Sequence, residues 1–112
     1  MSFTEFEMLK HEEVLKLYIE KIRPKVEIRN EIDIEYRIHN QSIEIIEKRR
    51  TGRKLIESPV AKTTYIRSRD KWRIYWQKAD MKWHVYEPQV EAKTLKKVIE
   101  IIERDEYGCF WG

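Results

Sequence analysis

The chain has 112 residues, of which 41% are hydrophobic and 38% are charged, and its net charge is +3. This length and hydrophobic content indicate one folded domain spanning residues 1–112, and they exclude a disordered chain. The single cysteine, Cys109, excludes an internal disulfide and a small secreted disulfide scaffold. Because no targeting segment or membrane-length apolar run is present, we expect a soluble, cytoplasmic protein that does not contact membranes.

The first predicted element is a helix from Thr4 to Arg23. Thr4 and Glu7 have the spacing of a capping box, and Pro24 disfavours helical geometry at the residue before it. Apolar residues recur at helical spacing. The expected buried face consists of Phe6, Leu9, Val14, Leu17, Tyr18 and Ile22.

From Ile32 the hydrophobic period changes to two, which is typical of strands with one buried face. Short turns separate five predicted strands, at 32–38, 43–48, 60–67, 72–77 and 83–87. Connections this short require antiparallel neighbours, so the pattern predicts a five-stranded antiparallel β-meander. The side chains expected to face the helices are Trp72, Ile74, Trp76, Trp83 and Val85, with Ile66 on the same side.

A second helix is predicted from Thr94, with Gly108 as a left-handed C-terminal cap. Its expected buried face consists of Leu95, Val98, Ile99 and Ile102. Phe110 and Trp111 are costly to expose, so the tail should dock against the domain. The predicted fold class is therefore α+β, with an N-terminal helix, the meander, and a C-terminal helix followed by a docked aromatic tail.

Three stretches carry a resemblance to a known family: Ser58-Pro59-Val60-Ala61-Lys62, the block RIYWQKADMKWHVYEP from Arg73 to Pro88, and the terminal GCFWG. Together they resemble a family of small bacterial proteins catalogued only as a domain of unknown function. The resemblance is clearest from Ser58 to the C-terminus. It implies one complete bacterial domain, and it implies no activity, ligand or catalytic residue.

Positive charge is concentrated in residues 48–82, which hold 12 Lys and Arg against 3 Asp and Glu. This asymmetry favours an anionic partner, and the aromatic residues interleaved with it favour base stacking. We therefore expect a non-catalytic domain that binds single-stranded or structured RNA or DNA. A basic loop suited to backbone contacts is formed by Lys48, Arg49, Arg50, Arg53 and Lys54. The open sheet face is expected to carry Tyr65, Arg67, Arg73, Tyr75, His84 and Tyr86, with Tyr75 and Tyr86 stacking on bases.

Other hypotheses remain open at this point. Tyr and Trp beside Lys and Arg are also ordinary on a half-buried sheet face. A protein–protein interaction or homo-oligomerisation module could use the Tyr-rich face or the Phe110–Trp111 tail as its interface. The sequence does not choose between RNA and DNA.

A metal-dependent, nuclease-like enzyme is a minor alternative. Glu91-Ala92-Lys93 matches an E-x-K pair with Asp70 or Asp80 upstream, but such short matches are frequent in a charged chain. His11, His39 and His84 fall on different predicted elements, without metal-ligand spacing. The sequence therefore predicts no catalytic residue, no cofactor and no metal site.

Overall fold

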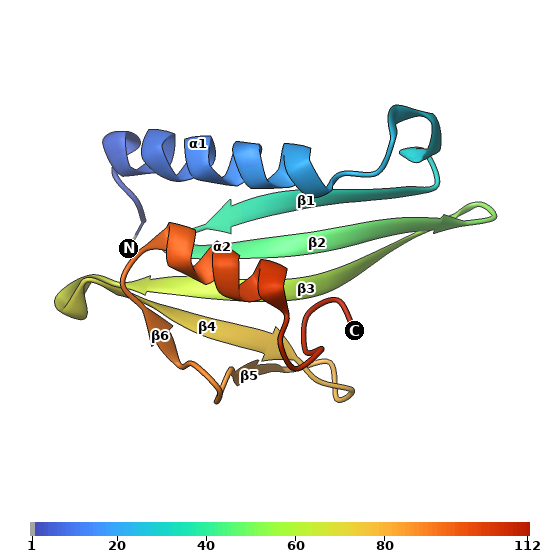
Figure 1. The fold of residues 1–112 in the computed structure, drawn as a ribbon. Helices are drawn as coiled ribbons and strands as arrows, with labels where there is room; N and C mark the ends of the chain where they lie inside the picture. The colour runs from blue at the N-terminus through green and yellow to red at the C-terminus, as the bar shows by residue number, and fades with distance from the viewer. Residues whose placement is uncertain (1) are drawn as a thin grey trace.

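Two helices lie on one face of a six-stranded antiparallel sheet in the computed structural model, which describes residues 2–112 (Figure 1). The strand order is β1-β2-β3-β4-β5, with the short β6 paired to β4. Sequence neighbours pair in antiparallel register, so the predicted α+β fold with a meander is confirmed. In this described part of the chain, no helix combines the length and the apolar character needed to cross a membrane.

Helix α1 (Glu5–Ile22) begins at the predicted capping box. The Thr4 hydroxyl accepts a hydrogen bond from the Glu7 N–H (3.2 Å), and the Glu7 carboxylate accepts one from the Thr4 N–H (2.9 Å). Arg23 has extended backbone geometry, as expected of the residue before Pro24, and it ends the helix.

The buried face of α1 differs from the prediction. Tyr18 is buried as expected, but its buried neighbours are Leu15 and Ile19. The predicted core residues that are instead exposed are Phe6, Leu9 and Leu17. Because α1 carries apolar side chains around most of its circumference, periodicity alone permits more than one buried face. Packing against the sheet selects the face on which Leu15 is fully enclosed.

Strands β1 (Ile32–His39) and β2 (Ser42–Thr51) form a hairpin whose turn is Asn40-Gln41. Strand β3 (Lys54–Ile66) starts earlier than the predicted Val60, because its exposed first residues pair with the end of β2 as a two-stranded ribbon. Pro59 is accommodated opposite Ile46, where the β2–β3 register shifts.

Strands β4 (Lys71–Gln77) and β5 (Trp83–Val85) complete the meander. Short 3₁₀ helices, η1 (Val26–Ile28) and η2 (Arg67–Arg69), lie in two of the connections. Strand β6 (Glu91–Ala92) was not predicted; it pairs with β4, with Ala92 opposite Trp72. A two-residue strand has no periodicity that a sequence pattern can reveal.

The helices and the sheet enclose one hydrophobic core. Its fully enclosed side chains come from both helices and from β2 and β4: Leu15, Ile43, Ile74 and Val98. Trp72 is buried in this core as predicted, and Trp76 packs against it at the edge. Burial of one such side chain contributes roughly 1.5–3 kcal/mol.

Helix α2 (Leu95–Arg104) buries its predicted face and ends at Asp105. Asp105 has φ of 42° and is the left-handed cap, a role predicted for Gly108. Its carboxylate accepts hydrogen bonds from the backbone N–H groups of Phe110 (3.0 Å) and Trp111 (2.9 Å). The Phe110 ring is buried 4.9 Å from the Tyr86 ring, so the tail docks, although Trp111 remains 36% exposed.

Candidate nucleic-acid interface

The side of the sheet opposite the helices carries no helix among residues 2–112, and we call it the open face (Figure 1). Side chains alternate along a strand and directly opposed residues share a face, so the register assigns each residue to one side. Trp72 and Ile74 are in the core, so the residues that alternate with them along β4, Arg73 and Tyr75, lie on the open face. The open-face residues of β3, β4 and β5 include Lys62, Thr64, Arg73, Tyr75, Trp83 and Val85.

On β1, β2 and the first half of β3, two cations of the open face, Arg37 and Lys48, are paired with carboxylates. Arg37 binds both Glu35 and Glu57. Lys48 lies 3.0 Å from Glu35 and 4.0 Å from Glu57. Because Arg37 and Lys48 already have carboxylate partners, these two cations attract phosphate less strongly than unpaired cations do.

The β3–β5 half of the open face is different. The Lys62 ammonium lies 5.4 Å from the centroid of the Tyr75 ring and 5.9 Å from that of the Trp83 ring. Among the described residues, neither Lys62 nor Arg73 has a carboxylate within ion-pair distance, although Glu44 is opposite Lys62 and Glu91 is opposite Arg73 in the register. Two half-buried rings and two cations without an ion-pair partner therefore lie on this half of the face, and of the two cations Arg73 is half-buried, with its Nε enclosed.

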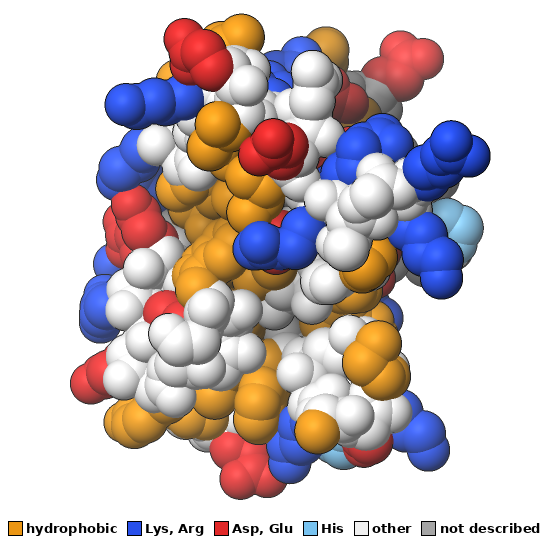
Figure 2. Space-filling model, turned by 90° about the vertical axis from the view of Figure 1, so that its right-hand side faces the viewer, with side chains coloured by type: hydrophobic (Ala, Val, Ile, Leu, Met, Phe, Trp, Pro, Cys, Tyr) orange, Lys and Arg blue, Asp and Glu red, His pale blue; other side chains and the backbone are white. Residues whose placement is uncertain are grey.

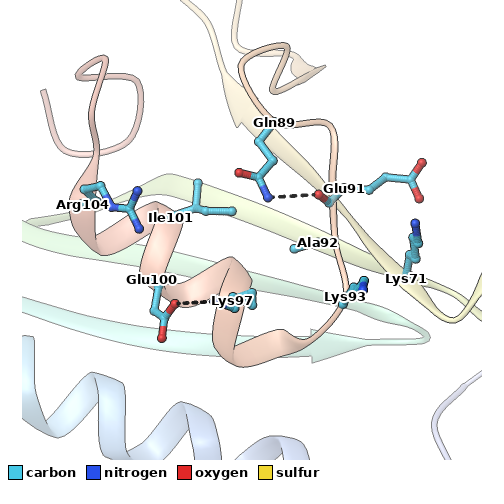
Figure 3. A pocket seen from close by; sticks show the side chains of 9 residues that line it. All are labelled: Lys71, Gln89, Glu91, Ala92, Lys93, Lys97, Glu100, Ile101 and Arg104. Carbon is cyan, nitrogen blue, oxygen red and sulfur yellow. Dashed lines mark hydrogen bonds and ion pairs between the residues drawn. The ribbon is translucent and has the colours of Figure 1, made fainter.

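A cleft of about 440 Å³ lies at the adjacent sheet edge, between β6 and α2 (Figure 3). Its ionised lining side chains are Lys71, Lys93, Lys97, Arg104, Glu91 and Glu100. Both carboxylates have basic neighbours, because Glu91 binds Arg69 and Glu100 lies 3.8 Å from Lys97. The other three cations have no ion-pair partner in the described part of the chain, so the lining of the cleft has an excess of positive charge.

The predicted basic loop is mostly strand. Because β2 continues to Thr51, alternation places Lys48 and Arg50 on the open face and Arg49 on the helix side. Arg49 lies 3.4 Å from Glu47, and Arg50 donates a weak hydrogen bond of 3.3 Å to the backbone of residue 30. The expected five-residue cluster is therefore divided between the two sides of the sheet.

Arg53 and Lys54 occupy the tip of the β2–β3 hairpin, where Gly52 adopts φ of 63°. Both side chains are exposed and lack an ion-pair partner among residues 2–112. Figure 2 shows the end of the molecule toward which this hairpin extends, with basic side chains gathered on its right and a hydrophobic band down its centre. These two cations are available to an anionic ligand.

Arg73 and Tyr75 lie on the open face as predicted, but Tyr65, His84 and Tyr86 do not. Tyr65 is opposite Trp72, with ring centroids 5.1 Å apart on the helix side. His84 is opposite Trp76 and approaches the Asp80 carboxylate at 2.8 Å.

Tyr86, expected to stack on a base, is only 2% exposed. Its backbone N–H donates a hydrogen bond of 2.8 Å to the Ile74 carbonyl, and burial raises the pKa of its hydroxyl above the usual value. The five-residue turn 78–82 sets this arrangement, because it pairs Gln77 with Trp83 and so sends Trp83 and Val85 to the open face. The prediction that these two side chains face the helices was wrong.

Arg67 is the remaining predicted site residue, and it is part of η2 rather than of β3. Its guanidinium donates two hydrogen bonds of 3.0 Å to the Glu7 carboxylate. It therefore ties the sheet to α1. Alternation cannot reveal this contact, because it joins residues far apart in the sequence.

The structure brings together residues that the sequence analysis did not select. Lys62 and Trp83 lie beside Tyr75 on the open face, and Lys71, Lys93 and Arg104 line the edge cleft. Trp83 could have been selected if the residue pairing across turn 78–82 had been known. The cleft had no sequence signal, because its walls come from β4, β6 and α2.

The described residues contain no group of three His, Cys, Asp or Glu side chains placed to hold a metal ion. The carboxylates of the nuclease-like fragment have separate partners: Asp70 accepts a hydrogen bond from Tyr65, and Glu91 binds Arg69. His11 packs edge-on against Trp72, with ring centroids 5.0 Å apart, and burial lowers the pKa of its imidazole.

One protein-family model matches residues 3–112, and its description is Domain of unknown function (DUF3024). The chain belongs to this family. The match confirms the resemblance carried by the Ser58–Lys62, Arg73–Pro88 and C-terminal segments. No curated protein and no solved structure matches the chain. The description of DUF3024 names no activity, ligand or partner.

Proposed function

We propose that the protein is a non-catalytic domain that binds single-stranded nucleic acid on the β3–β5 half of its open face. The observation that carries the proposal is the group formed by Lys62, Arg73, Tyr75 and Trp83, two rings and two unpaired cations on an uncovered sheet. Rings stack on any base, at roughly 1–3 kcal/mol per base, and neighbouring cations bind phosphates.

The edge cleft extends this surface. Lys71 belongs to β4, as do Arg73 and Tyr75, so unpaired cations continue from the rings toward Lys93 and Arg104. An extended strand can follow β4, with bases on the rings and phosphates on the cations of the cleft. The cations at the hairpin tip serve a longer strand. The β1–β2 half is left out of the proposed site because Arg37 and Lys48 are paired with carboxylates there, and Arg50 donates its hydrogen bond to the backbone carbonyl of residue 30.

A cytoplasmic location is part of the proposal. Cys109 is free, and burial raises the pKa of its thiol above the usual value. A protonated, partly buried thiol is a poor nucleophile and fits a structural role in a reducing compartment.

The direct test is binding of fluorescently labelled single strands of about 8 nucleotides, RNA and DNA, measured by anisotropy over a range of salt concentrations. We expect Tyr75→Ala to weaken binding about 5- to 150-fold, with little change in salt dependence. The matched control is Phe6→Ala, which removes a 71% exposed ring from α1, on the other side of the sheet. No binding at low salt, where phosphate contacts are strongest, would overturn the proposal. Equal effects of the two substitutions would overturn the location of the site.

A further inference from the structure

The side of α1 that points away from the sheet carries apolar side chains that nothing in residues 2–112 covers. Phe6, Leu9 and Leu17 are 71%, 69% and 72% exposed. Single exposed apolar residues are common, whereas three lie along the outer side of this 18-residue helix, and we call them the α1 patch. The capping box and the buried face hold the helix in place, so the patch is a fixed feature of the surface.

Two oppositely charged residues lie within this patch. Phe6, Lys10, Glu13 and Leu17 follow one another at spacings of four, three and four residues, which is the spacing of a coiled-coil seam. The Lys10 ammonium lies 5.4 Å from the centroid of the Phe6 ring. Among the described residues, neither Lys10 nor Glu13 has an ion-pair partner. The seam is therefore apolar at both ends and carries unpaired charges of opposite sign at its centre.

We propose that this seam binds a second copy of the chain through antiparallel α1–α1 packing. In an antiparallel pair, Phe6 faces Leu17 of the second copy, and Lys10 faces Glu13 of the second copy. Two-fold symmetry repeats each contact, so both apolar ends and both central charges are matched. A parallel pair would place Lys10 against Lys10 and Glu13 against Glu13, so the charges select the antiparallel arrangement.

The dimer and the proposed nucleic-acid site use opposite sides of the molecule. Helix α1 covers one face of the sheet, whereas Tyr75 and Trp83 lie on the other (Figure 1). Dimerisation therefore leaves the open face free, and either proposal can fail without the other. The seam is short compared with the interfaces of stable complexes, so we expect a dissociation constant on the order of 100 μM.

Sedimentation equilibrium of the full chain over a range of concentrations tests this pairing. Lys10→Glu brings two carboxylates together across the seam, and Glu13→Lys brings two ammonium groups together; we expect each substitution to weaken the dimer at least about tenfold. The double variant Lys10→Glu/Glu13→Lys restores opposite charges at both positions, and we expect it to dimerise like the wild type. Lys54→Glu, which makes the same charge change at the hairpin, is the matched control and should leave the dimer intact.

Leu17→Asp supplies a second, independent test, because it introduces a charge at each apolar end of the seam; we expect it to yield a monomer. All these positions are exposed, and circular dichroism confirms that each variant folds. A wild type that remains monomeric at about 1 mM overturns the proposal, as does an unaffected Leu17→Asp dimer. A double variant as weak as the single ones overturns the antiparallel pairing.

Discussion

Arg67 donates two hydrogen bonds of 3.0 Å to the carboxylate of Glu7, which joins the segment after β3 to the first turn of α1. The same carboxylate accepts a hydrogen bond from the Thr4 N–H, so one side chain both caps the helix and ties it to the sheet. The Arg67 hydrogen bonds, followed by the one from Thr4, lower the pKa of Glu7 from the ordinary 4.5 to about 2.

This contact predicts a pH-dependent contribution to stability. Because the pKa of Glu7 is lower in the folded state, its stabilising effect is complete above about pH 4.5 and is lost as the pH falls toward 2. We expect Glu7→Gln to lower the melting temperature at pH 7, and the difference from the wild type to shrink between these two pH values. Thermal melts followed by circular dichroism measure this difference in melting temperature at each pH. Glu5→Gln, in the same helical turn, is the control. A constant difference over this range would contradict the prediction.

The cap of α2 makes a second prediction. Asp105 combines a left-handed backbone, φ of 42°, with a carboxylate that holds the N–H groups of Phe110 and Trp111. Asp105→Gly keeps the backbone geometry without strain but removes the acceptor, whereas Asp105→Ala loses both. We therefore expect urea denaturation to rank stability as wild type, then Gly, then Ala, with Ala about 2–4 kcal/mol below wild type. A Gly variant as stable as the wild type would show that the carboxylate does not hold the tail.

Phe110 and Trp111 provide a matched pair of substitutions in the tail. Phe110 is 8% exposed and packs on Tyr86, so Phe110→Ala should lower the free energy of unfolding by about 3 kcal/mol. Trp111 is 36% exposed, and we expect its replacement by Ala to cost less. Deletion of residues 109–112 should cost at least as much as Phe110→Ala. An unchanged urea midpoint for the truncated protein would mean that the tail contributes nothing to the fold.

Local signals in the sequence were sufficient for much of this fold. The Thr4–Glu7 capping box, the two-residue period from Ile32 and the short turns each depend on residues close together in the chain, and all three are confirmed. Antiparallel pairing follows from the turns alone, because chain geometry leaves no other connection. The buried face of α2 was also predictable, since its polar and apolar residues are cleanly separated.

The wrong predictions concern residues that could face either side of a helix or strand. For these residues, contacts with segments distant in the sequence decide which side is buried. On α1, apolar residues such as Leu15 and Leu17 point in different directions, and only packing on the sheet decides which is buried. At β5, both Trp83 and His84 are compatible with alternation, and a shift of one residue across turn 78–82 exchanges every side chain between the faces. For this reason Tyr86, expected in the site, is buried in the core, whereas Trp83, expected in the core, lies on the open face.

The last prediction distinguishes two locations for the phosphate contacts. One is the proposed surface on β3–β5 with its edge cleft, and the other is the basic segment 48–54 that was expected from the sequence. The edge variant Lys71→Gln/Lys93→Gln removes unpaired cations of the cleft, and the hairpin variant Arg53→Gln/Lys54→Gln removes those at the β2–β3 tip. Each phosphate interaction that a substitution removes reduces the slope of log affinity against log salt by about 0.7 for single strands. With a strand of about 8 nucleotides, we expect the edge variant to lower this slope by about 1.4 and the hairpin variant to leave it unchanged.

Both variants remove two positive charges, so a difference between them reports location and not net charge. Lys16→Gln, which removes a cation paired with Glu12 on α1, should leave the slope unaltered. A decrease confined to the hairpin variant would move the phosphate contacts to the tip of β2 and β3, as the charge of residues 48–54 first indicated. Equal decreases in the two variants would mean that the strand extends from the cleft to the hairpin, because unpaired cations at both ends of the surface then contact phosphate.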